Sequence, residues 1–358
     1  MASTQPTSQH YPLLDTRQLR RAAVTIVTLY PLVLLVATTI IAIVPQRRGP
    51  LALFAIFAPY VFAAVIALVP FMFDRSARLL RILMLGCALV AAIWFGPSYV
   101  SSAPLETPDA LRFGAMTWNL YVHNTNTSAT LDVLRNGPSV VALQELSHEQ
   151  AAAISGDPQL RERYPHQWLE PGSADGIGVL SIFPITEQRL LLHPDHPDGM
   201  PTQHVRLDLG DGTTLNVVNV HPRTGRSHFL QHLPLPYDFD PTIRDQEIRY
   251  IRSVVDQLLA QNERVLLLGD FNTTEREPAY REFTRGLQDA HAAVGSGSGH
   301  SWRLSELRDQ PWSMLRIDYL LSGPGVTALR VATDCTPYGS DHCAVRGTFE
   351  LPDVPNGN

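Results

Sequence analysis

The stretch Val265–Asn272, VLLLGDFN, decides the fold of this chain. Its apolar run, ended by glycine and polar residues, is typical of a short buried strand. Directly before it, apolar residues recur at helical spacing from about Thr242 to Gln261, with charged residues on the other face. A helix that leads into a buried strand with a carboxylate at its end, Asp270, indicates an α/β domain.

Further strand-like runs, separated by helical stretches and turns, lie on both sides of this unit. They are residues Leu111–Leu120, Ser139–Leu143, Ile177–Ile182, Gln203–Leu209, Thr214–Val220, Ile317–Leu321, Val326–Ala332 and His342–Glu350. A helix is expected at Ala129–Arg135, and Ser147 with Gln150 has the spacing of a capping box that opens another. The mixture predicts an α/β sandwich rather than a helical bundle or an all-β domain.

Polar residues stand at the ends of these expected strands, where a rigid sheet can present them to a substrate. They are Asn119 in TWN, Glu145 in QEL, His221 in NVHPR, Asp270 and Asn272 in GDFN, Asp318 in RIDYLL, and Ser340, Asp341 and His342 in SDH. Carboxylates and an amide oxygen suit a hard divalent cation such as Mg²⁺. An aspartate can activate water, histidines can move protons, and a cation can stabilise phosphate charge, so the set predicts hydrolysis of a phosphate ester.

These motifs resemble, in type and in order, those of the endonuclease/exonuclease/phosphatase superfamily. The resemblance covers residues 111–350, nearly all of the chain beyond its apolar N-terminal part. It implies a four-layer α/β sandwich of the DNase-I-like kind, with the site at one edge of two packed sheets. It also implies a divalent-metal cofactor, Mg²⁺ or alternatively Mn²⁺.

The resemblance implies a role for each motif residue. Glu145 is expected to be the principal metal ligand, with Asn119 nearby and Asp341 as a further ligand. Asp270 resembles the residue that positions or deprotonates the attacking water. Asn272 resembles the residue that contacts the phosphate.

The histidines complete this expected site. His342 would contact or protonate the phosphoryl group, oriented by Asp318. His221 matches a histidine of the DNase-I, sphingomyelinase and phosphatase branches, which abasic-site nucleases lack. Arg244, in RDQEIRYI, is assigned to substrate binding. Ile182, in ADGIGVLSIFPI, stands where the family commonly has arginine, and this departure puts a substrate contact from that position in doubt.

The first hundred residues differ from the rest, because they contain three long apolar runs at 22–44, 51–73 and 82–100. Each is close to the ~20 residues that a helix needs to cross the hydrocarbon core of a bilayer. A cleaved signal peptide would have an apolar region of only ~7–15 residues, with no further runs after it. The pattern predicts three transmembrane helices that precede the α/β sandwich and follow an N-terminal tail, residues 1–21.

Arginines around the apolar runs predict the orientation. Six lie before the first run or between the second and third, and two lie between the first and second; they are Arg17, Arg20, Arg21, Arg75, Arg78 and Arg81 against Arg47 and Arg48. The positive-inside rule then places the N-terminus in the cytoplasm. We therefore expect a multi-pass protein of the cell membrane, with a linker at 101–110, an extracytoplasmic catalytic domain at 111–353 and a tail at 354–358.

The charge of the catalytic part narrows its partners. The chain has 28 basic residues, all of them arginine, and from residue 109 onward 20 arginines face 31 acidic residues, a net charge of −11. Nucleic-acid binding usually requires a basic surface, so the composition argues against a nucleic-acid partner. Cys335 and Cys343 could pair in an oxidising compartment, but the sequence leaves this open.

Three spans followed by an extracytoplasmic domain of this superfamily resemble the VanJ-type membrane proteins of bacteria. Those proteins are associated with resistance to glycopeptides such as teicoplanin and with dephosphorylation of lipid-carrier pyrophosphates. The resemblance implies a lipid-phosphate or lipid-pyrophosphate substrate, such as undecaprenyl pyrophosphate, and no protein partner. The alternatives are a phosphodiesterase of phospholipid or sphingomyelin head groups, an extracytoplasmic endonuclease, and a tethered binding module with a degenerate site.

One further segment, Ser227–Pro241, is rich in apolar and aromatic residues and in proline. Its proline content predicts a loop. The simplest interpretation is a packed surface loop. The alternative is that it contacts the bilayer, or an acyl or isoprenoid chain of the substrate.

Overall fold

The computed structural model describes residues 15–96, 104, 106–229 and 236–352. The chain divides into two compact units: residues Met1–Val44 with Phe57–Phe95, and residues Pro45–Ile56 with Gly96–Asn358. The predicted tails at 1–21 and 354–358 and the linker at 101–110 lie wholly or partly outside the described residues.

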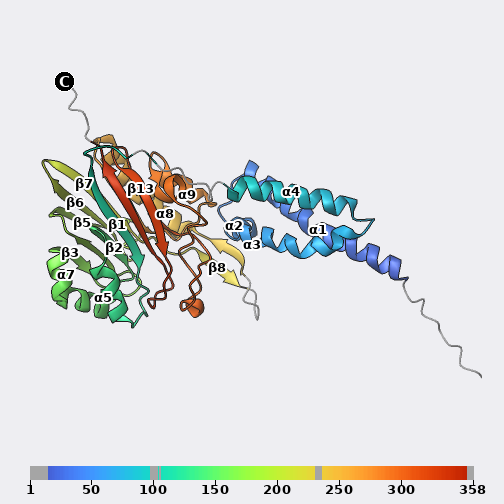
Figure 1. Ribbon diagram of the computed structural model, residues 1–358, viewed down its shortest axis with the longest axis horizontal. Coiled ribbons are helices and arrows are strands. Elements are labelled where there is room, and N and C mark those ends of the chain that lie inside the picture. Colours follow the sequence, from blue (N-terminus) through green and yellow to red (C-terminus); the bar gives the residue numbers. More distant parts are fainter. Residues whose placement is uncertain (1–14, 97–103, 105, 230–235, 353–358) are drawn as a thin grey trace, which may run out of the picture. The chain divides into compact units, whose positions relative to one another are not determined.

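The first unit is helical (Figure 1). It consists of α1 (Thr16–Ile43), α3 (Ala58–Ala63), the 3-10 helix η1 (Ala64–Phe73) and α4 (Arg78–Phe95). Within the described part of the chain, α1 and α4 are each long and apolar enough to cross a membrane, with mean hydropathies of 2.5 and 1.9. These two helices correspond to the first and third apolar runs, although residues 97–100 lie outside the described part.

The second apolar run does not form one continuous helix. The run is broken between helix α2 (Gly49–Ile56) and the helical stretch Ala58–Phe73. Pro59 lies in the first turn of α3. A proline has no N–H to donate and clashes with the carbonyl four residues earlier, here that of Ala55, so the helix is interrupted at this point. Hydropathy alone gives no sign of such a break.

The second unit contains two six-stranded sheets, each with parallel and antiparallel neighbours. The first has the order β13 (Thr327–Asp334), β14 (Ala344–Leu351), β1 (Leu111–Asn119), β2 (Val140–Gln144), β4 (Ile177–Ser181), β3 (His166–Glu170). The second has the order β11 (Gln288–Asp289), β12 (Asp318–Ser322), β10 (Val265–Asp270), β7 (Thr213–Val220), β6 (Thr202–Gly210), β5 (Ile185–Leu191).

Helices cover the outer face of each sheet. Helices α5 (Thr127–Arg135), α6 (His148–Gly156) and α7 (Pro158–Arg163) pack on the first sheet, and α8 (Thr242–Ala260) and α9 (Pro278–Thr284) pack on the second. The short helices α10 (Ala290–Val294) and η3 (Ser305–Leu307) lie in the connection from β11 to β12. A third apolar cluster fills the space between the sheets. The predicted four-layer α/β sandwich is confirmed.

A separate two-stranded ribbon follows β7. It is made of β8 (Arg226–Phe229) and β9 (Pro236–Asp240), which pair antiparallel. The segment Ser227–Pro241 was expected to be a loop, and this was wrong at both of its ends. Residues 230–235 lie outside the described part of the chain.

Strand periodicity carries the polar motif residues into the space between the sheets. On β10, Leu266 and Leu268 face the inter-sheet core, and Asp270 is the next residue of that series. On β7, Leu215 and Val217 face the core, and Asn219 follows. Side chains alternate along a strand with a period of two, so these alternate residues all point into the space between the sheets. The polar residue comes last in each series, and the polar groups therefore gather at one edge of the sandwich.

Candidate active site

Both sheets contribute to one site at this edge. In the first sheet, β1 and β2 run parallel and end at Asn119 and Gln144, while β14 runs antiparallel to β1 and begins just after His342. In the second sheet, Asp270 at the end of β10 is directly paired with Asp318 at the start of the antiparallel β12. The C-terminal ends of β1, β2 and β10 and the N-terminal ends of the antiparallel β12 and β14 therefore lie at the same edge.

Asn119 connects two carboxylates that come from different sheets. Its Nδ2 donates to Oε1 of Glu145 at 3.0 Å and to Oδ2 of Asp270 at 3.1 Å. The other oxygen of Glu145 accepts the backbone N–H of Val122 at 3.0 Å. Burial disfavours ionisation of Glu145, but the nearby His221 and this backbone hydrogen bond outweigh it and lower the pKa of Glu145. Glu145 is therefore an ionised carboxylate at neutral pH.

His342 lies between two buried aspartates. Its Nδ1 is 2.9 Å from Oδ2 of Asp318, and its Nε2 is 3.6 Å from Oδ2 of Asp270. Burial alone would lower the pKa of His342, but the two carboxylates outweigh it and raise the pKa to about 10. Burial raises the pKa of Asp270 to about 6, in spite of the opposing effect of His342. His342 is thus a proton donor at neutral pH, and Asp270 can take up a proton near it.

His221 completes the group. Its Nε2 lies 3.6 Å from Oδ2 of Asp270 and 4.0 Å from Oε1 of Glu145. Its Nδ1 is buried and has no hydrogen-bond partner among the residues that the structure describes. The imidazole therefore faces both carboxylates with one edge.

The turn after β10 presents Asn272. Gly269 has a φ of 151°, and a Cβ there would lie 2.0 Å from the carbonyl oxygen of Val220, so no other residue fits this position. Asn272 itself has a φ of 48° in the left-handed region. Its backbone N–H donates to Oδ1 of Asp270 at 2.8 Å, and its Nδ2 donates to the carbonyl of Pro222 at 3.0 Å. These bonds hold the turn in a strained conformation that is common at functional sites.

Arg244 supports this turn from beneath. The side chain is buried, and its Nη1 donates to the carbonyl of Asn272 at 2.7 Å. Its charge is balanced by Asp245, at 3.1 Å, and by Glu277, at 2.6 Å. These partners engage the guanidinium, which contacts the backbone of the turn at Asn272. Its predicted substrate-binding role stays a prediction.

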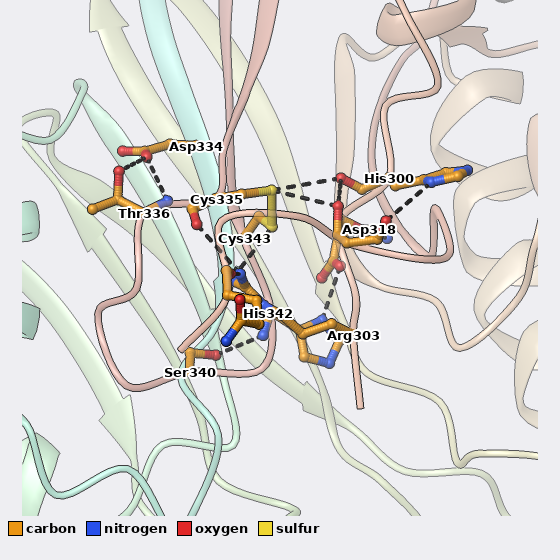
Figure 2. The surroundings of a disulfide bond; sticks show 12 residues. His300, Arg303, Asp318, Asp334, Cys335, Thr336, Ser340, His342 and Cys343 are labelled. Carbon is orange, nitrogen blue, oxygen red and sulfur yellow. Dashed lines mark hydrogen bonds and ion pairs between the residues drawn. A yellow bond between two sulfur atoms is a disulfide. The ribbon is translucent and has the colours of Figure 1, made fainter. Parts of the chain in front are cut away.

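The SDH loop is tied to β1 and to a disulfide. The hydroxyl of Ser340 donates to the carbonyl of Asn119 at 2.7 Å and accepts the N–H of His342 at 2.9 Å. Cys335 and Cys343 are paired, and the loop they close carries Ser340 and His342 (Figure 2). Asp341 turns its carboxylate to the hydroxyl of Ser305, at 2.7 Å. Its predicted role as a metal ligand is not tested by these contacts.

A buried amide network lies directly behind the site and was missed from the sequence. Nε2 of Gln144 donates to Oδ1 of Asn219 at 2.7 Å, which joins the first sheet to the second. Oε1 of Gln144 accepts from Thr117, and Nδ2 of Asn219 donates to the carbonyls of Leu143 and Gly178. The signal was available in part, since Gln144 and Asn219 are polar residues inside otherwise apolar strands.

The donor set fits a divalent cation. The side-chain ligand atoms of Asp270, Asp318 and His342 lie within 4.8 Å of one another, and Glu145 and Asn119 adjoin them. Because His342 is protonated, the carboxylate oxygens are the atoms available to a cation. Oδ1 of Asp318 is buried without a hydrogen-bond partner among the described residues. Three carboxylates that converge in a buried space repel one another, and a hard cation bound by oxygen would relieve this repulsion.

The four-layer sandwich and its carboxylate–histidine edge define a phosphoesterase fold. The sequence signature of the Endonuclease/Exonuclease/phosphatase family matches residues 116–342. The chain belongs to this family. No curated protein matches the sequence significantly.

Solved structures share the fold at low sequence identity. Truncated TDP2 from Caenorhabditis elegans has a TM-score of 0.50 at 21% identity, covering 67% of this chain and 98% of that one. D. rerio TDP2 complexed with a single-strand DNA product has a TM-score of 0.51 at 18% identity, covering 66% and 98%. An endonuclease/exonuclease/phosphatase from Beutenbergia cavernae has a TM-score of 0.50 at 17% identity, covering 69% and 73%. At these identities the likeness extends to the fold alone.

Proposed function

We propose that this protein is a membrane-anchored, divalent-metal-dependent phosphoesterase that removes phosphate from a membrane-lipid phosphate or pyrophosphate. The observation that carries the proposal is the convergence of Glu145, Asp270 and Asp318 with two histidines at one sheet edge, in a chain with apolar N-terminal helices. Undecaprenyl pyrophosphate is the specific candidate, by resemblance to the VanJ-type proteins.

Each side chain has a chemical task in this proposal. Asp270, whose pKa is raised to about 6, orients the attacking water and accepts its proton. His342 is held protonated by Asp318 and donates to a phosphoryl oxygen, while Asn272 contacts the phosphate and His221 stabilises its charge. Glu145, with Asn119 and Asp341, would hold Mg²⁺ or Mn²⁺. Such an ion supplies charge stabilisation on the phosphoryl and leaving oxygens.

A contact in the second unit supports the membrane topology. Nη1 of Arg47 lies 3.0 Å from Oδ2 of Asp245, and its other nitrogen pairs with Glu282. This contact supports a topology in which the loop that follows the first apolar helix is on the same side of the membrane as the catalytic domain. In this topology, the chain between that loop and the catalytic domain crosses the membrane an even number of times. Two crossings meet this requirement.

The lengths of the helices are compatible with two such crossings. Helix α2 belongs to the catalytic unit, so the first of these two crossings would consist of α3 and η1. They have six and ten residues. At about 1.5 and 2.0 Å per residue they rise roughly 29 Å, close to the ~30 Å of a hydrocarbon core. With α1 and α4, the proposed topology has three crossings, and its N-terminus is on the opposite side of the membrane from the catalytic domain.

The disulfide supports an extracytoplasmic catalytic domain. Cys335 and Cys343 are bonded, and Cys343 is buried beside His342. Disulfides persist in oxidising compartments and are rare where thiol reductants are abundant. The arginine distribution around the apolar runs points the same way.

The ribbon β8–β9 supports contact with lipid. Phe229 and Tyr237 expose 57% and 50% of their surface on it. Exposed aromatic side chains are typical of surfaces that contact a membrane interface or an apolar ligand. The ribbon follows His221 in the chain, so an isoprenoid or acyl chain bound there would extend from the site.

The alternative functions differ from the proposed one in the substrate that the site would hydrolyse or bind. An extracytoplasmic nuclease is disfavoured by the net charge of −11 from residue 109 onward. A phosphodiesterase of phospholipid or sphingomyelin head groups would use the same site residues. A tethered binding module would not need the complete set of carboxylates and histidines.

Phosphate release from undecaprenyl pyrophosphate by full-length protein in detergent tests the proposal. Release is expected with Mg²⁺ and not with EDTA, and Asp270→Ala and His342→Ala should abolish it. Asp211→Ala, in an exposed hairpin turn at the opposite edge of the second sheet, is the control and should be as active as the wild type. If the protein instead cleaves only a phosphodiester such as bis-p-nitrophenyl phosphate, or naked DNA, the corresponding alternative replaces the proposal.

A further inference from the structure

A short segment, residues 300–303, adjoins both residues of the pair formed by Asp318 and His342. It follows α10 and precedes η3 in the connection from β11 to β12, and none of the motifs named from the sequence includes it. Figure 2 shows its two ends, His300 and Arg303, near the disulfide together with Asp318 and His342. The hydrogen bonds of this segment show how the pair is held together.

One edge of the segment pairs with the chain that leads into Asp318. The N–H groups of Ser301 and Trp302 both donate to the carbonyl of Leu315, at 2.8 and 2.9 Å. The N–H of Leu315 donates back to the carbonyl of Trp302 at 3.1 Å, and these two residues form an antiparallel bridge. This edge therefore holds the chain just before β12 of the second sheet.

The other edge pairs with the loop that carries His342. Trp302 forms a second antiparallel bridge, with His342 itself. The N–H of Cys343 donates to the carbonyl of Ser301 at 2.7 Å. The segment is therefore bonded on one edge to the chain that leads into β12 and on the other edge to the chain that leads into β14 of the first sheet.

The hydroxyl of Ser301 adds a further connection. Ser301 is fully buried, and its Oγ accepts the N–H groups of Ile317 at 3.3 Å and of Asp318 at 3.1 Å. Both donor residues are buried as well, and a buried N–H group without an acceptor is unfavourable. The hydroxyl thus satisfies the backbone at the point where β12 begins with Asp318.

Ser301 therefore contacts the backbone beside each residue of the pair. Its Oγ accepts the N–H of Asp318, and its carbonyl accepts the N–H of Cys343, the neighbour of His342. The two residues of the pair belong to different sheets, and the 2.9 Å contact between their side chains requires a fixed separation of the two backbones. Site residues keep a productive geometry when hydrogen bonds behind them fix their positions.

We propose that Ser301 is a positioning residue that aligns Asp318 with His342 across the two sheets. Its effect on turnover rests on the proposed function, whereas its effect on the imidazole of His342 follows from the hydrogen bonds alone. Without the hydroxyl, the N–H groups of Ile317 and Asp318 lose their acceptor. The start of β12 then shifts, and the imidazole is held less well against the carboxylate.

Turnover by the full-length protein in detergent gives the first test. The substrate is whichever of undecaprenyl pyrophosphate and bis-p-nitrophenyl phosphate the wild type hydrolyses. Ser301→Ala should lower kcat at least tenfold, within the ~10²-fold that a misplaced catalytic group can cost, and leave KM within about twofold of wild type. The matched control is Ser322→Ala, because Ser322 is buried on β12 and its Oγ has no hydrogen-bond partner among the described residues. Its kcat should equal that of the wild type.

A double-mutant cycle separates positioning from a general structural effect. If Ser301 acts through Asp318, Ser301→Ala should lower the kcat of Asp318→Ala by less than about threefold, whereas independent effects would multiply. Losses that multiply would overturn the inference and leave the proposed function standing. A kcat within about twofold of wild type in Ser301→Ala would have the same meaning.

The second measurement needs no turnover. Proton NMR of histidine-labelled protein should show a downfield Nδ1–H signal for His342, because this proton lies in a buried, charged hydrogen bond to Asp318. The signal is assigned by its absence in His342→Gln. We expect it to move upfield or disappear in Ser301→Ala and to stay in Ser322→Ala.

An unchanged signal in Ser301→Ala overturns the inference, whatever the protein hydrolyses. A signal that depends on Ser301, in a protein that hydrolyses no phosphoester, would support the positioning role and remove the proposed function.

Discussion

Nδ1 of His342 lies 2.9 Å from Oδ2 of Asp318, and the two residues come from different sheets. His342 precedes β14 of the first sheet, and Asp318 begins β12 of the second. This charged hydrogen bond therefore joins the sheets at the edge where the chemistry is proposed to occur. It also fixes the protonation of the imidazole, since the nearby carboxylates raise the pKa of His342 to about 10 despite its burial.

Replacing Asp318 by asparagine should test this pair. Asp318→Asn keeps the shape but removes the negative charge, so the pKa of His342 should fall. His342 is protonated below its raised pKa and loses its proton as the pH rises through it, so the alkaline loss of activity should begin at a lower pH in the variant. We expect kcat to fall by ~10²–10⁴, the usual contribution of a positioned acid or base. Asp211→Asn, in an exposed turn, should leave both kcat and its pH profile unchanged.

Glu145→Gln should weaken metal binding. Glu145 is ionised and contributes its full charge to the proposed site, whereas a glutamine contributes none. Even outer partners of metal ligands change affinity by about 10–100-fold, so we expect the Mg²⁺ concentration for half-maximal activity to rise at least tenfold. Glu149→Gln, on the exposed surface of α6, is the matched control. An unchanged Mg²⁺ requirement in Glu145→Gln would exclude this residue as a ligand.

Loss of the disulfide should affect stability and activity together. A cross-link across a short loop stabilises by about 2–3 kcal/mol, which is roughly 5–10 °C in Tm for a domain of this size. Cys335→Ala with Cys343→Ala should therefore lower Tm, and kcat should fall because the loop carries His342. Reducing agent should have the same effect on wild type and none on the double variant. Cys87→Ala, which leaves the disulfide intact, should respond to reducing agent as wild type does.

His204 should make the catalytic unit sensitive to acid. It is buried against Asn216, at 2.9 Å, and burial lowers its pKa. The folded state then binds this proton less readily than the unfolded state, so the stability is fully present above the unfolded pKa near 6.5 and is lost as the pH falls below it. The free energy of unfolding should decrease by up to about 1.4 kcal/mol per pH unit for this one group. In His204→Gln the decrease in Tm between pH 7 and pH 5.5 should be smaller than in wild type; an identical decrease would contradict the assignment.

Single cysteines should report the proposed topology. In a Cys87→Ala background, a membrane-impermeant maleimide applied to intact cells should label Pro45→Cys and Asp211→Cys, which would lie on the outer side. Ser76→Cys, between the second and third proposed crossings, should be labelled only after the cells are opened. Labelling of Ser76→Cys but not Asp211→Cys on intact cells would invert the orientation.

Much of the fold and site could be predicted because it depends on local pattern. The alternation of side chains along β10 places Asp270 between the sheets, at the edge of the sandwich. The other site residues could be identified because they occur in short motifs in a fixed order. The contact of Arg47 with Asp245 could not be predicted, since it joins residues 198 positions apart and depends on the docked position of α2. The break at Pro59 was visible in the sequence, but average hydropathy gave it no weight.

The hydrogen bond between Gln144 and Asn219 has a consequence for how this protein can be engineered. It lies at the floor of a site whose two halves belong to separate sheets, so activity reports the relative alignment of the sheets. New termini or inserted domains should then be tolerated in turns at the edge of the sandwich opposite the site. An example is the hairpin at Asp211, which joins two neighbouring strands of the same sheet. Chain breaks at the edge that carries the site would separate the residues contributed by the two sheets. Recovery of catalysis would then report that the two sheets have reassembled.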